Sequence, residues 1–157
     1  MTQTIVVTEF LSLDGVMEAP NEWNIPYVDE TLGADIQGEL DRATANRFND
    51  LPKYVVSSTL RETSWAPTTI LRGDAVAVMK ELKSSGGGRI LVWGSRQLVQ
   101  TMAAARLVDE YVLYVHPLVL GKGAHLFAEG HHQDLELTSA KTYARGVVAL
   151  RLRPRAK

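Results

Sequence analysis

Cysteine is absent from the 157 residues of this chain. Its absence excludes disulfides, thiolate metal ligands and thiol nucleophiles, and it fits a reducing compartment. Long apolar runs are absent too, so no segment has the length and composition of a membrane span. The N-terminus reaches the acidic Glu9 without the cationic and apolar regions of a signal peptide. We therefore expect a cytoplasmic protein with no membrane partner.

An excess of positive charge is also missing. Lys and Arg number 17 against 18 Asp and Glu, which gives a net charge of -1. Such a chain has no summed positive field that would attract a nucleic acid backbone, so we expect no nucleic acid partner. No Gly-x-Ser-x-Gly turn occurs, which excludes the usual nucleophile elbow of a hydrolase.

The histidines near the end of the chain have metal-ligating neighbours. His125, Glu129, His131 and His132 lie within eight positions of one another, but Gly130 among them is typical of a solvated loop. We expect no metal site here. His116, in a strand before Pro117, is interpreted as a structural residue.

Apolar residues are present in sufficient number for one core. The chain is 45% hydrophobic and 22% charged, which is typical of a globular domain. We expect one domain over residues 1–153, followed by a frayed tail over 154–157.

Strands and helices alternate along the first two thirds of the sequence. Runs of strand character occupy residues 4–10, 53–57, 68–71, 89–93 and 110–116. Helical spacing of apolar residues covers 33–48 (Ile36, Leu40, Ala43 and Phe48), the segment after Asp74 (Val76, Met79 and Leu82) and the segment after Ser95 (Leu98, Val99 and Met102). Residues 18–28 are expected to be irregular, because Pro20 and Pro26 interrupt them.

This order predicts an α/β fold with a three-layer mixed sheet. Alternating strands and helices imply parallel crossovers, and a C-terminal hairpin of 135–143 with 147–152 adds antiparallel strands. The sheet is therefore expected to be mostly parallel, with helices on both faces. Gly86, Gly87 and Gly88 are interpreted as a helix stop and a turn into the next strand.

The pair Gly94-Ser95 is the first candidate for ligand binding. It follows a buried strand and precedes a helix, which is where ligands collect in an open α/β sheet. The glycine would let a phosphate approach the backbone, and the helix N-terminus offers free N–H groups. Taken alone, the pair fits an ordinary helix N-cap equally well.

The segment Ser57-Ser58-Thr59-Leu60-Arg61 is the second candidate. Three hydroxyls and a guanidinium after a strand suit the ribose 2′-phosphate of NADPH. A turn closed by local hydrogen bonds from these hydroxyls is the alternative interpretation.

The third candidate is Ser12-Leu13-Asp14-Gly15, which puts a carboxylate at the end of the first strand. Asp14 is expected either to orient or protonate a substrate or to form an Asx turn. Trp23, between Pro20 and Pro26, is a candidate to cover a planar heterocycle, with simple packing as the alternative.

Several ordered blocks together resemble one family. They are EFLSLDGVMEAP (9–20), PKYVVSSTL (52–60), VWGS (92–95), LVDE (107–110), PLVLGKG (117–123) and LF (126–127). These blocks resemble bacterial dihydrofolate-reductase-like proteins related to the reductase domain of riboflavin biosynthesis. The resemblance implies an NADPH-dependent reductase, commonly a homodimer, in which the SSTL segment and the GS turn contact the dinucleotide and Asp14 faces the substrate.

The sequence departs from the family pattern at one place. Family members usually carry a further strand, ending in a Gly-Arg-x-Thr-Tyr-Glu-like turn, before the KYVVSSTL strand. Residues 27–52 contain no such block. A strand missing from the middle of a parallel sheet leaves its neighbours to be paired in another way, because unpaired buried backbone groups are costly.

The expected activity is hydride transfer from NADPH to a C=N or C=O of a small heterocycle, such as the ribosylamino-pyrimidine of riboflavin synthesis. Asp14 and Trp23 would contact the substrate, Ser57, Ser58, Thr59, Leu60 and Arg61 the adenosine end, and Gly94, Ser95, Arg96 and Gln97 the pyrophosphate. The missing block leaves two alternatives, a non-catalytic nucleotide-binding remnant and a structural dimer.

Overall fold

A computed structural model describes residues 2–41 and 49–155 of the chain. The strands are β1 (Thr4–Ser12), β2 (Lys53–Val56), β3 (Thr68–Leu71), β4 (Arg89–Trp93), β5 (Glu110–His116), β6 (Leu135–Thr142) and β7 (Val148–Pro154). The helices are α1 (Pro20–Trp23), the 3-10 turn η1 (Ile25–Tyr27), α2 (Glu30–Asp41), α3 (Ala75–Ser84) and α4 (Arg96–Ala104).

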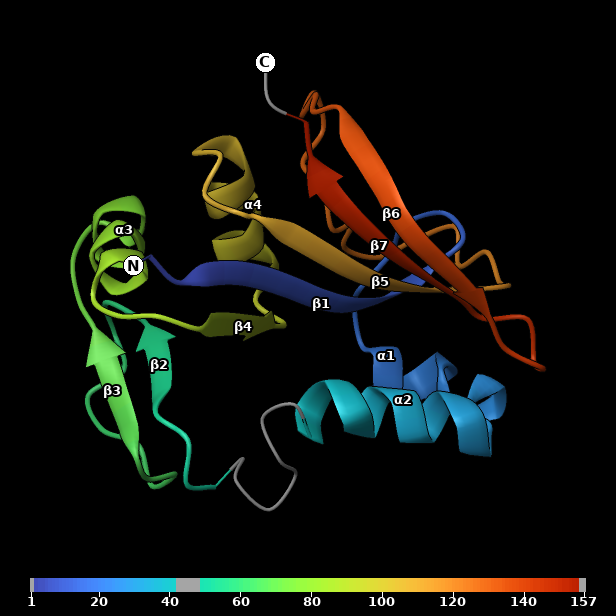
Figure 1. Cartoon of the computed structure of the whole chain (residues 1–157), viewed down its shortest axis with the longest axis horizontal. Coiled ribbons are helices and arrows are strands. Elements are labelled where there is room, and N and C mark those ends of the chain that lie inside the picture. The colour runs from blue at the N-terminus through green and yellow to red at the C-terminus, as the bar shows by residue number, and fades with distance from the viewer. Residues whose placement is uncertain (1, 42–48, 156–157) are drawn as a thin grey trace.

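The main sheet has the order β4-β1-β5-β7-β6. Strand β1 lies parallel to both β4 and β5, whereas β7 and β6 add to β5 as an antiparallel hairpin. Helices α1 and α2 lie on one side of the sheet and α4 on the other (Figure 1). The predicted mixed α/β sheet with helices on both faces and a C-terminal hairpin is thus confirmed.

Successive side chains of β1 point to opposite faces of the sheet, and the core accordingly consists of two clusters. Ile5 and Val7 point to the side of α3 and α4, where they pack with Met79 and Met102. Val6 points to the opposite side and packs in the cluster that contains Leu32 of α2. Because β1 is buried on both faces, it lacks the polar alternation of an edge strand.

The strands form two separate sheets. Strands β2 and β3 pair with each other in parallel but form a separate two-stranded sheet. They are joined to the rest by side chains, since Val56 and Leu71 pack in the same cluster as Met79 of α3. Among the described residues, no strand lies between Ser12 and Lys53. The strand that the family pattern places there is therefore not found in the described part of the chain.

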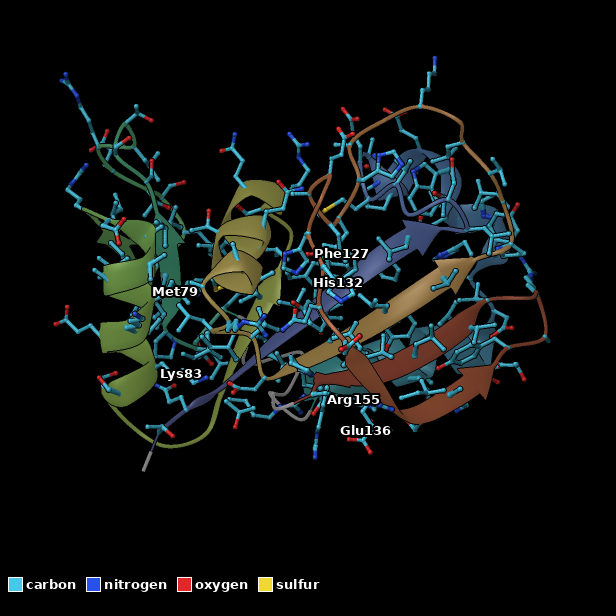
Figure 2. The ribbon with its side chains drawn as sticks, turned by 90° about the horizontal axis from the view of Figure 1, so that it is seen from above. Met79, Lys83, Phe127, His132, Glu136 and Arg155 are labelled. Atoms are coloured by element: carbon cyan, nitrogen blue, oxygen red, sulfur yellow. The ribbon has the colours of Figure 1, made fainter. Side chains whose placement is uncertain are left out.

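Helix α3 forms as the sequence predicts. Asp74 caps it by accepting a hydrogen bond from the Ala77 N–H at 2.8 Å, and its inner face carries Met79 and Leu82. Lys83 in its last turn forms a 2.6 Å ion pair with Asp109 at the start of β5. Figure 2 shows Met79 and Lys83 along this helix.

Three boundaries differ from the predictions. Residues 18–28 are not irregular throughout, because Pro20 and Pro26 stand in the first turns of α1 and η1, where a missing N–H costs nothing. Helix α2 begins at Glu30 rather than Gly33, with Asp29 accepting the Leu32 N–H, and its expected continuation through Ala43 and Phe48 lies outside the described residues. Strand β7 continues to Pro154, and Arg155 donates to the Asp134 carbonyl, so these two residues are not frayed.

Candidate functional site

The GS turn joins β4 to α4. Gly94 and Ser95 both have left-handed backbone conformations, with φ of 77° and 63°. Ser95 occupies the N-cap position of α4, but its side chain makes no capping hydrogen bond. A side chain added at Gly94 would meet no atom within 4 Å, so the turn borders open space. No side chain of the N-cap residue therefore satisfies the first-turn N–H groups of α4, as an ordinary serine N-cap would.

A buried carboxylate reaches this turn from the neighbouring strand. Glu9 of β1 is only 4% exposed, and its Oε1 accepts a hydrogen bond from the Gly94 N–H at 2.8 Å. Burial raises the pKa of Glu9 to about 7, and the Gly94 hydrogen bond opposes this rise only in part. Glu9 is not among the site residues that the sequence motifs predict. Its spacing of two and four from Val7 and Ile5 places it on the same inward face of β1, which was the available signal.

Asp14 holds two loops together. Its Oδ1 accepts from the Ser12 hydroxyl at 2.6 Å and from the Leu120 N–H at 3.1 Å, and its Oδ2 accepts from the Gly121 N–H at 2.8 Å. The Ser12 hydroxyl, followed by the Gly121 and Leu120 N–H groups, lowers the pKa of Asp14 to about 2. A carboxyl that stays ionised in this way is suited to holding loop geometry rather than to donating a proton.

The segment that follows β2 has mainly local hydrogen bonds. Ser57 Oγ accepts from the N–H groups of Thr59 and Leu60, as in the local-turn interpretation. Arg72 braces the outer side of this turn by donating to the carbonyls of Ser58 and Leu60. The hydroxyls of Ser58 and Thr59 and the guanidinium of Arg61 belong to exposed residues. Arg72 was missed because it lies outside the motif and acts through the backbone.

Trp23 lies against His116 rather than against Asp14. The two rings meet edge to face, with centroids 5.2 Å apart, and the Trp23 indole donates to the Glu18 carbonyl. His116 at the end of β5 is fully buried, so its interpretation as a structural residue agrees with its burial.

The three candidate segments are not equally close in the fold. Backbone pairing of β1 with β4 brings the GS turn beside Glu9, and the pairing of β1 with β5 brings Ser12 beside His116. The Ser57–Arg61 segment belongs to the separate sheet, so its position relative to the GS turn depends on side-chain packing through α3.

A different part of the molecule contains a cavity of about 300 Å³. Asp35 of α2 lies in its wall, where it accepts hydrogen bonds from Lys141 and from the Tyr143 hydroxyl. Its charged lining residues are paired within the protein, Lys141 with Asp35 and Arg151 with Glu110. In the part of the chain that the structure describes, no group of three His, Cys, Asp or Glu is placed to hold a metal ion, and no helix is long and apolar enough to cross a membrane.

Comparison with known proteins gives a family match. A family model described as the RibD C-terminal domain matches residues 34–149. The chain is 26% identical to the uncharacterized protein YyaP of Bacillus subtilis, over 91% of this chain and 76% of that one. It is also 26% identical to YwjB of the same organism, over 94% of this chain and 96% of YwjB. The YwjB match extends over 168 residues, more than the 157 of this chain, so YwjB has residues within the matched region that this chain lacks.

Solved structures share the fold. A putative riboflavin biosynthesis protein from Shewanella sp. PV-4 has a TM-score of 0.70 at 19% identity, covering 98% of this chain and 100% of that one. A pyrimidine reductase-like protein from Corynebacterium diphtheriae has a TM-score of 0.67 at 11% identity, covering 99% and 93%. The riboflavin biosynthesis reductase Rib7 of Saccharomyces cerevisiae has a TM-score of 0.62 at 13% identity, covering 99% and 90%.

Proposed function

This chain belongs to the family of RibD C-terminal domains, and from this premise we propose that it is an NADPH-dependent reductase. Its substrate would be a small pyrimidine- or pterin-like heterocycle with a reducible C=N or C=O, of the kind that 5-amino-6-(5-phosphoribosylamino)uracil represents. The names of its structural neighbours, which include a pyrimidine reductase-like protein and a riboflavin biosynthesis reductase, support this class of reaction.

The conformation of the GS turn is the main support for this proposal. Two successive left-handed residues, Gly94 and Ser95, turn the chain sharply at the end of β4 and leave the start of α4 without a side-chain cap. A structural helix start does not need this conformation, whereas a phosphate needs free N–H groups and close access to the backbone. Gly94, Ser95, Arg96 and Gln97 would hold the pyrophosphate.

The turn after β2 would hold the other end of the dinucleotide. Ser57, Ser58, Thr59, Leu60 and Arg61 would contact the adenosine portion, with Arg61 and the free hydroxyls facing the 2′-phosphate. Arg72 would act on this contact indirectly, by keeping the Ser58 and Leu60 carbonyls in place.

When bound, NADPH supplies the hydride, and the protein supplies alignment and an environment of low water content. Asp14 would position the substrate loop by holding residues 120 and 121, because its low pKa opposes a role as proton donor. Trp23, the last residue of α1, would lie at the substrate side, on the face of the sheet that α1 and α2 cover.

A fluorescence titration with NADPH and NADH tests the proposal. Gly94→Asp places a negative charge against the pyrophosphate, and Gly94→Asn is its control because it imposes the same backbone strain without the charge. Ser58→Asp and Ser58→Asn form the second pair. We expect saturable NADPH binding that is weakened at least tenfold by each aspartate relative to its asparagine, and weaker binding of NADH than of NADPH. Equal effects of aspartate and asparagine, or no binding at millimolar NADPH, would contradict the proposal.

One observation favours a non-catalytic remnant as the second candidate. The sheet is split between β4 and β2, so the backbone does not fix the two halves of the dinucleotide site relative to each other. This candidate predicts weak or absent NADPH binding by a folded protein. We also expect the active protein to be a cytoplasmic homodimer, and sedimentation with and without NADPH separates it from a purely structural dimer, which would be insensitive to every nucleotide.

A further inference from the structure

His116 has a buried nitrogen atom without a partner. Its Nδ1 lies 2.9 Å from the Tyr114 carbonyl and 3.2 Å from the Leu11 carbonyl, so Nδ1 must carry the proton. Nε2 is then a hydrogen-bond acceptor, and it has no partner among the described residues. Burial lowers the pKa of His116, which keeps the ring neutral and Nε2 unprotonated.

Three aromatic side chains surround the imidazole. Phe10 of β1, Trp23 of α1 and Tyr27 of η1 each meet it edge to face, with centroid distances of 5.8, 5.2 and 5.8 Å. We call these three residues the aromatic cage. Carbon-rich surroundings offer no donor to Nε2, so the acceptor is left unsatisfied at a cost that folding alone does not require.

The position of the cage distinguishes His116 from the other unsatisfied buried atoms. Tyr111 also has an unpartnered hydroxyl, but it lies near the start of β5 in the cluster beneath α3 and α4. Asp29 Oδ2 is unpartnered as well, but it belongs to a carboxylate whose other oxygen accepts the Leu32 N–H at the start of α2. His116 ends β5 and pairs with Ser12, at the carboxyl ends of the parallel strands, where ligands bind in open α/β sheets.

The cage is also connected to the GS turn. Phe10 contacts Trp93 edge to face at 5.8 Å, and Trp93 immediately precedes Gly94. Trp93 is 38% exposed, so a partly open aromatic row runs from the turn to His116 through Phe10. A planar ring beside this row would lie next to a dinucleotide held at the turn, as hydride transfer requires.

One short segment covers His116. Trp23 and Tyr27 belong to consecutive single turns, α1 and η1, which the Trp23 indole ties to Glu18 and the Arg145 guanidinium ties to the Pro26 carbonyl. Both hydrogen bonds are exposed to solvent. Tyr27 also packs against the cluster that contains Leu32, whereas Trp23 belongs to neither core cluster, so the Trp23 ring is the part of this cover that can be displaced at the lower cost.

We propose that Nε2 of His116 accepts a hydrogen bond from a ring N–H of the heterocyclic substrate, which enters between His116 and Trp23, so that the Trp23 ring moves off the imidazole and covers the heterocycle. The inference rests on the proposed reductase function and assigns the substrate subsite within it. Within that substrate class it assigns to His116 the recognition of the imide or amide N–H that pyrimidinediones and pteridinediones carry.

The test compares a probe that has this donor with one in which methyl groups replace the hydrogens, and the two variants described below separate loss of the donor from the added volume. Lumazine has ring N–H groups on its pyrimidinedione, and 1,3-dimethyllumazine has methyl groups in their place. We expect calorimetry on the whole protein to show about tenfold tighter binding of lumazine, the value of one hydrogen bond to a buried acceptor. In 15N NMR, the Nε2 resonance of His116 should shift with lumazine and stay in place with the dimethyl compound.

Two variants separate this role from a structural one. His116→Asn retains a donor for the Tyr114 carbonyl but removes Nε2, so it should fold and lose the discrimination between the probes. His116→Gln removes the inner donor and places an amide near Nε2, so it should lower the thermal midpoint more but keep part of the discrimination. If the ratio of the two probe affinities changes in step with the thermal midpoint across the two variants, the inference is overturned. If neither variant folds, the 15N shift of His116 Nε2 in the wild-type protein decides between the outcomes.

NADPH titration of the same samples separates this inference from the proposed function. If NADPH binds but lumazine does not bind at millimolar concentration, the His116 subsite is overturned and the reductase proposal remains. If lumazine is discriminated and NADPH does not bind, the subsite stands and the reductase proposal fails.

Discussion

Glu9 on β1 accepts a hydrogen bond from the backbone N–H of Gly94 on the neighbouring strand, with 2.8 Å between Oε1 and N. The GS turn thus already has an anionic neighbour within the protein itself. Because Glu9 is buried on the same face as α4, the carboxyl ionises there with difficulty.

The first prediction concerns stability against pH. The pKa of Glu9 is about 7 in the folded protein, against its ordinary value of 4.5. Between these two pH values the folded protein holds a proton that the unfolded chain has lost, so the free energy of unfolding falls as pH rises and the full loss persists above pH 7. The wild-type protein should therefore lose about 3 kcal/mol of unfolding free energy between pH 4.5 and 8, and Glu9→Gln should not show this loss.

Urea unfolding at several pH values measures this difference. Glu136→Gln, on the exposed strand β6, is the control and should leave the pH dependence of the wild type unchanged. If the unfolding free energy of the wild type and of Glu9→Gln depends on pH in the same way, the buried carboxyl is not the cause of the pH dependence.

The second prediction concerns the cofactor. A phosphate at the GS turn would lie beside Glu9, and two anions at close range repel each other. NADPH affinity should therefore fall as pH rises through about 7, and Glu9→Gln should bind several-fold more tightly than the wild type at pH 8 but equally at pH 6. Comparison of the two proteins at each pH cancels the titration of the cofactor itself. A constant ratio of the two affinities would contradict the prediction.

The third prediction concerns the loop held by Asp14. Asp14→Ala should speed amide hydrogen exchange at Leu120 and Gly121, because both N–H groups lose their acceptor. Glu18→Ala is the matched control, since Glu18 accepts only from the neighbouring Ala124 N–H among the contacts of this loop. The protection should persist in the wild type down to about pH 3, because the pKa of Asp14 is about 2. Faster exchange at all three amides in both variants would indicate general loosening instead.

The sequence predicted the central strands well, because burial leaves a strong pattern. β1, β4 and β5 are rich in β-branched and other apolar residues, and the Asp74 cap and the inward Met79 mark α3 clearly. The short helices between Pro20 and Tyr27 were not predicted, because each is a single turn and has no periodicity to detect.

Site contacts were harder to predict when they join distant parts of the chain. The positions of the GS turn and of Asp14 follow from local motifs, and so does the Ser12 partner of Asp14, but its other two partners, Leu120 and Gly121, are more than a hundred residues away. Asp109 accepts from the Ile5 N–H and pairs with Lys83, and no local motif of the sequence indicates either contact. Pairings of this kind depend on strand order, which propensity alone does not determine.

The last prediction concerns the close approach of the loop after Asp14 to the loop around Gly123. Gly123 has φ of +115°, and a Cβ there would lie 2.7 Å from Val16 Cγ1, a distance that no packed pair of atoms tolerates. Val16 is 1% exposed and bridges His125, so neither side can move without breaking the contact between the loops. Gly123→Ala should therefore lower the free energy of unfolding by about 3 kcal/mol, from the left-handed strain and the overpacking together.

Gly121→Ala is the matched control. Gly121 also has a positive φ, of +72°, but a Cβ there would meet no atom within 4 Å. It should cost only about 1–2 kcal/mol, the backbone term alone. Chemical denaturation of both variants measures the difference, and equal losses would mean that the loops do not pack as closely as the Val16 contact implies.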